Sequence, residues 1–193
     1  MLPDSWGETQ AINATIALSA LSLLESRINI SAESVVRALN QEPLRGRLQR
    51  VAGPVERILD VAHNPAATRQ LCDFLTKNPV AGKTYAVFSL LQDKDLERII
   101  SMISEVIDHW YVPALESDRA CDTMTIAQAI VEGTRGGCSQ FPDPPSAYLS
   151  ALKGSDKGDR IVVFGSFLVV GAILPLVENG RTPDHCAPEG RII

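Results

Sequence analysis

The stretch that decides the fold is Leu44–Pro65, which reads LRGRLQRVAGPVERILDVAHNP. Its apolar part, ILDVA at residues 58–62, is short and rich in β-branched residues, which predicts a buried strand and not a helix of its own. Asn64 is a good N-cap, and Pro65 suits the first helical position, where a missing N–H costs nothing. The stretch therefore predicts a strand that leads directly into a helix.

Asp60 and His63 fall at the carboxyl end of this predicted strand. Ligands of open α/β sheets bind at such strand ends, and the free N–H groups of a helix N-terminus favour anions. We therefore expect a phosphate-bearing ligand. Asp60 could accept a ribose hydroxyl or be a plain loop carboxylate. His63 could orient a carboxylate or phosphate, or only cap the helix.

Composition sets the broad class of protein. The chain has 193 residues, 45% of them hydrophobic and 21% charged, which is ordinary for a soluble globular protein of one domain and part of a second. A net charge of −5 without a Lys/Arg cluster excludes a nucleic-acid footprint. The four cysteines lie far apart, without the spacing of a zinc site or a disulfide framework. The N-terminus lacks a signal-peptide pattern and no apolar run is long enough for a membrane span, so we expect a cytoplasmic protein without a membrane partner.

The pattern before the opening stretch differs from the pattern after it. Residues 10–25 are apolar on nearly all sides, which is typical of a helix buried by several neighbours, and Ser31 begins a second helix. No strand precedes these helices, so we interpret them as the tail of an adjoining domain that ends in a Pro/Gly linker. The expected parts are a helical tail over 1–43, a second domain over 44–178 and a flexible tail over 179–193.

After the linker, strands alternate with helices, which indicates βαβ units. The fold class that we expect is α/β: a three-layer, Rossmann-like, mostly parallel sheet of about six strands flanked by helices. The predicted strands cover residues 48–51, 56–62, 84–90, 109–112, 138–141 and 160–165. The predicted helices begin at Pro65, Asp93, Asp122, Pro144 and Ser166.

Three further side chains are candidates for ligand binding. Arg47 lies in the linker, where a guanidinium could contact phosphate through two hydrogen bonds, although a solvated arginine is the commoner case. Lys94 could bind ribose or phosphate, but its acidic neighbours could simply complement a helix dipole. Ser166 could bind a ligand carboxylate, yet capping alone would explain it.

Several common catalytic motifs are absent from the sequence. Gly82-Lys83-Thr84 looks like the end of a Walker A loop, but position 77 is Lys77 and the triplet precedes a strand. No GxGxxG supports a nicotinamide enzyme, and no GxSxG supports a hydrolase.

Six sequence blocks together form a recognisable pattern. They are, in order, NATIALSAL at 13–21, GRLQRV at 46–51, DVAHNP at 60–65, LLQDKDL at 90–96, DHWYVPALESDRA at 108–120 and VFGSF at 163–167. The pattern resembles the C-terminal part of the folylpolyglutamate synthase/dihydrofolate synthase group of the Mur ligase family. The resemblance implies a P-loop ATPase domain joined to a C-terminal Rossmann-like domain, with the active site between them.

The same resemblance implies ATP-dependent addition of L-glutamate to dihydropteroate or folylpolyglutamate through an acyl phosphate, with Mg²⁺ as cofactor. The metal ligands and the P-loop would lie mainly in the adjoining domain, so we expect no metal site in this chain and no activity from it alone. The alternative is a freestanding nucleotide- or glutamate-binding module. The implied roles are ATP binding by Asn13, Arg47 and Asp60, glutamate binding by His63 and Ser166, and Lys94 as a further candidate.

Overall fold

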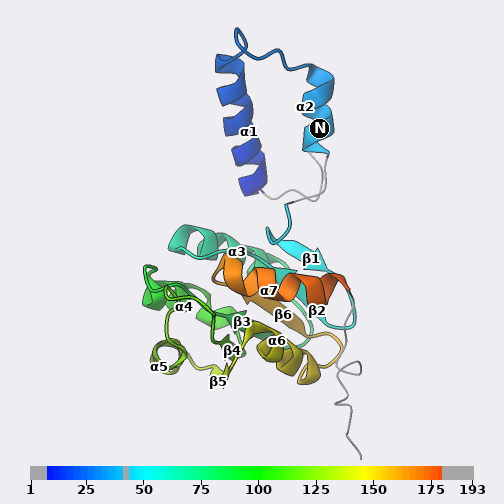
Figure 1. Cartoon of the computed structure of the whole chain (residues 1–193). Helices are drawn as coiled ribbons and strands as arrows, with labels where there is room; N and C mark the ends of the chain where they lie inside the picture. Colours follow the sequence, from blue (N-terminus) through cyan, green and yellow to red (C-terminus); the bar gives the residue numbers. More distant parts are fainter. Residues whose placement is uncertain (1–7, 41–43, 180–193) are drawn as a thin grey trace, which may run out of the picture. The chain divides into compact units, whose positions relative to one another are not determined.

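The computed structural model describes residues 8–40 and 44–179. The chain divides into two compact units, Met1–Leu44 and Arg45–Ile193 (Figure 1). The first unit holds helices α1 (Glu8–Leu23) and α2 (Ala32–Leu39), and Ser31 caps α2 by accepting the N–H of Ser34. The flexible tail predicted for residues 179–193 lies outside the described residues from 180 onward.

Helix α1 differs from its prediction in burial. Because the helix is apolar on nearly all sides, its sequence predicts burial by several neighbours. In the structure, however, most of its side chains from residue 11 onward are exposed, and the exposed fraction of Leu23 is 87%. The reason is that α2 is only 8 residues long, with no buried residue, and offers little apolar surface. The prediction of a buried helix is therefore wrong for this chain.

The second unit is built on a six-stranded sheet in the order β1-β2-β6-β3-β4-β5, in which only β1 runs antiparallel to its neighbour. This mostly parallel sheet, with helices on both faces, confirms the predicted α/β class. The strands are β1 (Gln49–Val51), β2 (Glu56–Leu59), β3 (Thr84–Phe88), β4 (His109–Pro113), β5 (Gly137–Phe141) and β6 (Arg160–Phe164). The helices are α3 (Pro65–Lys77), α4 (Leu96–Ile103), η1 (Ser104–Val106), α5 (Thr123–Gly133), α6 (Pro144–Lys153) and α7 (Phe167–Glu178).

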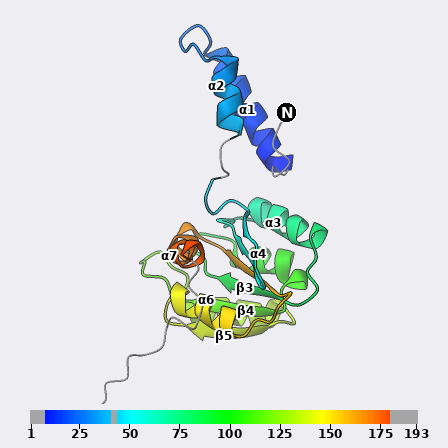
Figure 2. The same cartoon turned by 90° about the vertical axis from the view of Figure 1, so that its right-hand side faces the viewer.

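Alternate residues of each inner strand enter two separate cores. In β2, Ile58 packs with α3, α4 and α5, whereas Leu59 packs with α6 and α7. In β6, Val162 and Val163 divide in the same way. The sheet is therefore the middle of three layers, with α3 and α4 on one side and α7 on the other (Figure 2).

Helix α4 begins two residues later than predicted. Its N-cap is Asp95, which accepts the N–H of Arg98, and not Asp93. Asp93 is instead engaged by Lys94 at 2.6 Å and by Arg119 at 3.2 Å. Because Arg119 comes from a distant loop, a tertiary ion pair decides between two aspartates that sequence alone makes equivalent.

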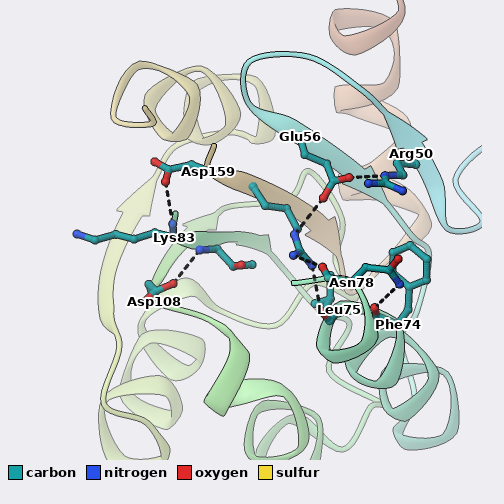
Figure 3. A network of polar contacts seen from close by, with 10 residues as sticks. Arg50, Glu56, Phe74, Leu75, Asn78, Lys83, Asp108 and Asp159 are labelled. Carbon is teal, nitrogen blue, oxygen red and sulfur yellow. Dashed lines mark hydrogen bonds and ion pairs between the residues drawn. The ribbon is translucent and has the colours of Figure 1, made fainter. Parts of the chain in front are cut away.

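A buried arginine joins the amino-terminal edge of the sheet to the end of α3. Arg160 is 1% exposed, and its guanidinium contacts Glu56 at 3.2 Å and the carbonyl oxygens of Leu75 and Asn78 at 3.4 and 2.5 Å. Figure 3 shows Glu56 between this network and Arg50, with which it also pairs. The charge is thus satisfied by one carboxylate and two helix-end carbonyls.

The turn between β6 and α7 requires glycine. Gly165 has φ of +109°, and a Cβ at this position would overlap the carbonyl oxygen of Ser89 and lie 2.8 Å from the ring of Phe88. We expect Gly165→Ala to lower the free energy of unfolding by about 1–3 kcal/mol. Gly171→Ala is the control, because nothing lies within 4 Å of its Cβ position and alanine favours a helix. Urea unfolding of both variants tests this, and equal stability would contradict it.

No helix in the described ranges combines the length and the apolar character that crossing a bilayer requires.

Candidate functional site

The candidate site lies at the carboxyl ends of β2 and β6. The two strands are parallel neighbours, and backbone bonds continue past them, from Asp60 N–H to Val163 O and from Gly165 N–H to Ala62 O, each at 2.9 Å. The helices that follow, α3 and α7, pack on opposite faces of the sheet. Open α/β sheets bind ligands at strand ends arranged in this way, and we call the ends of β2 and β6, with the first turns of α3 and α7, the crevice.

Both helices begin in this crevice with a capping side chain. Asn64 accepts the N–H of Ala67 at 2.9 Å, and Ser166 accepts the N–H of Val169 at 3.1 Å. The first backbone N–H groups of a helix carry partial positive charge and suit an anion. The junction predicted at Asn64 and Pro65 is confirmed to the residue.

Asp60 connects the strand end to the turn that precedes β1. It is 9% exposed, and its Oδ2 accepts the N–H of Leu48 at 2.8 Å while Oδ1 accepts the N–H of Ala62 at 2.7 Å. The turn is also tied by the N–H of Val61, which donates to Gly46 O at 2.9 Å. Residues 46–48 are therefore fixed against the end of β2.

An exposed aromatic side chain lies close to two of the candidate residues. The guanidinium carbon of Arg47 lies 5.8 Å from the ring centre of Phe167, within the range of a cation–π contact. The ring of His63 lies 5.8 Å from the same ring, tilted by 49°. Phe167, which is 59% exposed and begins α7, thus lies near both Arg47 and His63.

A hydrogen bond between His63 and a nearby backbone carbonyl determines which ring nitrogen is available to a ligand. Its Nδ1 lies 2.8 Å from the carbonyl oxygen of Val61. Because a carbonyl only accepts, Nδ1 carries a proton and Nε2 is the ring nitrogen that can meet a ligand.

The structure does not bring all predicted residues to this point. Ser166 is at the crevice but 3% exposed, with its oxygen engaged as the α7 cap. Lys94 follows β3 and is paired with Asp93. Asn13 lies on α1 in the other unit, where it is exposed. The residues that gather are Arg47, Asp60, His63 and Ser166.

Burial and charge move the pKa values of two aspartates in opposite directions. Burial raises the pKa of Asp60 above its ordinary value, against the opposing effect of the N–H groups of Leu48 and Ala62. The hydrogen bond from Lys94, and then that from Arg119, lower the pKa of the exposed Asp93.

We expect a ¹³C NMR titration of the carboxyl carbons to place Asp60 above about 3.9 and Asp93 below it. Since the folded-state pKa of Asp60 is raised, its contribution to stability is complete below its unfolded pKa and is lost as pH rises through the folded value. A titration of Asp60 at or below that of Asp93 would contradict the expectation.

Outside the crevice, the sheet has a hollow, and the described residues form no metal-binding cluster. Within residues 8–40 and 44–179, no group of three or more His, Cys, Asp or Glu side chains could hold a metal ion. A hollow of about 310 Å³ lies at the opposite, amino-terminal edge of the sheet, away from the crevice. Its lining residues are Lys83, Tyr85, Asp108, His109 and Tyr111.

Phe167 and Leu48 are the two residues that the sequence reasoning missed. An aromatic residue at the first position of a helix, directly after a strand, is a signal that could have identified Phe167. Leu48 has a positive φ of 45°, which no pattern of leucine residues predicts.

A family model described as Mur ligase, glutamate ligase domain, matches residues 46–167. The dihydrofolate synthase/folylpolyglutamate synthase of Buchnera aphidicola subsp. Acyrthosiphon pisum is 32% identical over 170 residues, which cover 88% of this chain and 40% of that protein.

Solved structures give the same likeness. E. coli FolC in complex with DHPP and ADP has a TM-score of 0.76 and 27% identity, covering 94% of this chain and 40% of that one. A bifunctional folylpolyglutamate synthase/dihydrofolate synthase with Mn, AMPPNP and L-glutamate bound has a TM-score of 0.68 and 34% identity, covering 81% and 38%. The chain spans about 40% of the length of the Buchnera relative and of the dihydrofolate synthase/folylpolyglutamate synthase of Escherichia coli.

Proposed function

Because the chain belongs to the Mur ligase family through its glutamate ligase domain, we propose that it is the C-terminal portion of a folylpolyglutamate/dihydrofolate synthase. The observation that carries the proposal is the extent of the family match. It begins at Gly46, beside Arg47, and ends at Phe167, so it spans the whole crevice. The resemblance found in the six sequence blocks is confirmed at the level of the family.

The proposed reaction is ATP-dependent amide formation. A carboxylate of dihydropteroate or of a folylpolyglutamate attacks the γ-phosphate of ATP, and ADP leaves. The amino group of L-glutamate then displaces phosphate from the acyl phosphate. Such a transfer depends on positive charge around the moving phosphoryl group. In this chain, the exposed guanidinium of Arg47 is the group that fits the task.

The crevice supports a division of roles among its residues. Arg47 meets the phosphates of ATP, with Asp60 on the ribose side. His63, through Nε2, and the α7 N-terminus at Ser166 face the carboxylates of the incoming glutamate. Asn13 on α1 contacts the adenine, and Lys94 is a further candidate once released from Asp93.

The described residues of the crevice fit the phosphate groups of a nucleotide better than they fit a metal ion. The crevice offers a cation and two helix N-termini, which suit phosphate, but no carboxylate cluster that suits Mg²⁺. The relatives bind Mn or ADP in their solved complexes. We propose that residues of the P-loop domain hold Mg²⁺, which would supply positive charge beside the phosphates. We also propose that the enzyme is cytoplasmic.

The test is to supply the absent domain. The chain alone should release no ADP above background from ATP, dihydropteroate and glutamate. The chain fused to the P-loop portion of the E. coli relative should release ADP at an enzymatic rate that depends on glutamate. An enzyme-like rate from the chain alone would contradict the need for a second domain, and a fusion no faster than the P-loop portion alone would contradict the ligase proposal.

A freestanding nucleotide- or glutamate-binding module is the alternative function. The relatives named above are all synthases, which does not favour it. Under this alternative, calorimetry on the isolated chain would show tight ADP or glutamate binding that Asp60→Ala abolishes, while the fusion stayed inactive.

A further inference from the structure

We propose that Asp60 is a positioning residue that holds Arg47 in place through the backbone of the turn at residues 46–48. The inference rests on the proposed function, because it assumes that Arg47 is the group that meets phosphate. It assigns Asp60 a task in addition to its place on the ribose side of the nucleotide.

The first observation is how completely the carboxylate is engaged. Oδ2 accepts the N–H of Leu48 from the turn, and Oδ1 accepts the N–H of Ala62 from the strand end. The group is 9% exposed, so little of it faces a ligand. Its hydrogen bonds thus join two segments that are 12 residues apart in sequence.

The second observation is strain in the turn. Leu48 has a φ of 45°, a conformation that residues with a side chain rarely adopt. Such a conformation persists only when its surroundings hold it. The short bond from the Leu48 N–H to Asp60 fixes the backbone, and the Leu48 side chain packs against the core that contains Ile58.

The third observation is where Arg47 sits. Its neighbour Gly46 is anchored on both sides, by its N–H to Gln49 Oε1 at 2.9 Å and by its carbonyl to Val61 N–H. Its other neighbour is Leu48. Arg47 is therefore the exposed residue of an anchored turn, and its guanidinium rests over Phe167. If Leu48 were released, the base of the Arg47 side chain would move.

A second buried aspartate provides a matched control for the role of Asp60. Asp159, 6% exposed, also accepts two backbone N–H groups, from Lys83 at 2.7 Å and Asp156 at 2.8 Å. It lies at the amino-terminal edge of the sheet, next to Lys83 in Figure 3, and has no contact with the turn. Asp159→Asn thus removes an equivalent carboxylate without touching Arg47.

The experiment first measures Arg47 itself by NMR on the full chain. The ring of Phe167 shifts the side-chain protons of Arg47, and Phe167→Leu gives their values without the ring. Asp60→Asn should move them toward the Phe167→Leu values, whereas Asp159→Asn should leave them unchanged. Gln49→Met removes the acceptor of the Gly46 N–H at the other end of the turn and should give a smaller shift in the same direction. This variant replaces Asp60→Asn in the test if Asp60→Asn does not fold.

The second measurement compares two probes by calorimetry, inorganic pyrophosphate and ADP. If Asp60 positions Arg47, Asp60→Asn weakens both probes by a similar factor, about tenfold, and adds little in an Arg47→Ala background. If Asp60 contacts ribose instead, only ADP binding weakens and the effect persists without Arg47.

Unchanged Arg47 resonances in Asp60→Asn, or a loss confined to ADP, would overturn the inference. If the chain binds neither probe, the phosphate role of Arg47 in the proposed function is contradicted for the isolated chain, while the NMR comparison still decides whether Asp60 sets the turn.

Discussion

Replacing Arg47 with alanine should slow ligation by about 10²- to 10³-fold when this chain is joined to its P-loop domain. The reason is that phosphoryl transfer is accelerated mainly by fixed positive charge, and the exposed guanidinium of Arg47 is held over Phe167 at the crevice. The measurement is the rate of ADP release at saturating ATP and glutamate, so that a loss of binding alone is not mistaken for a loss of rate.

Arg45→Ala is the matched control for Arg47. Arg45 lies in the same turn but pairs with Glu178 at 3.4 Å, and its side chain is 74% exposed. Its removal takes the same charge from the same segment and should leave the rate within a few-fold. Equal losses in the two variants would show that only the overall charge of the turn matters, and would contradict a specific role for Arg47.

Replacing Arg160 with methionine should lower the free energy of unfolding by about 3–5 kcal/mol. The variant keeps the volume but leaves Glu56 without its buried partner and two carbonyls without a donor. The carbonyl of Leu75 has no helical substitute, because the residue four positions on is Pro79, which has no N–H. Urea denaturation of the chain measures the loss.

Arg50→Met provides the comparison for Arg160. Arg50 pairs with the same Glu56, but its side chain is 57% exposed, so its removal should cost no more than about 1 kcal/mol. The double variant Glu56→Leu/Arg160→Met should recover part of the loss, because no buried carboxylate then lacks its partner. Arg160→Met within 1 kcal/mol of the parent would contradict a structural role for the buried guanidinium.

Local chemistry made most of the fold predictable. The start of α3 at Pro65 follows from the Asn-Pro pair, and β3 and β6 follow from short β-branched runs. These elements depend on residues adjacent in sequence. The start of α4 does not, because Asp93 and Asp95 are both suitable caps, and in the structure Asp93 is engaged by Lys94 and by Arg119 from a distant loop.

The location of the site could be predicted from the sequence, but the contacts among its side chains could not. The strand-end rule brings Asp60, His63 and Ser166 to one edge, and the structure confirms that grouping. The strand-end rule could not reveal that the carboxylate of Asp60 accepts the N–H of Leu48, because this hydrogen bond joins two residues that are 12 apart in sequence. Nor could spacing indicate that the ring of Phe167 lies near both Arg47 and His63.

The place of β6 has a consequence for biosynthesis. This strand pairs with both β2 and β3, although it follows them in sequence by about a hundred and by about seventy residues. On the ribosome, the nascent chain therefore carries two unpaired strand edges until residues 160–164 emerge. The sheet closes only when its last strand inserts at the centre, so the strand-end crevice is assembled late in synthesis and all at once.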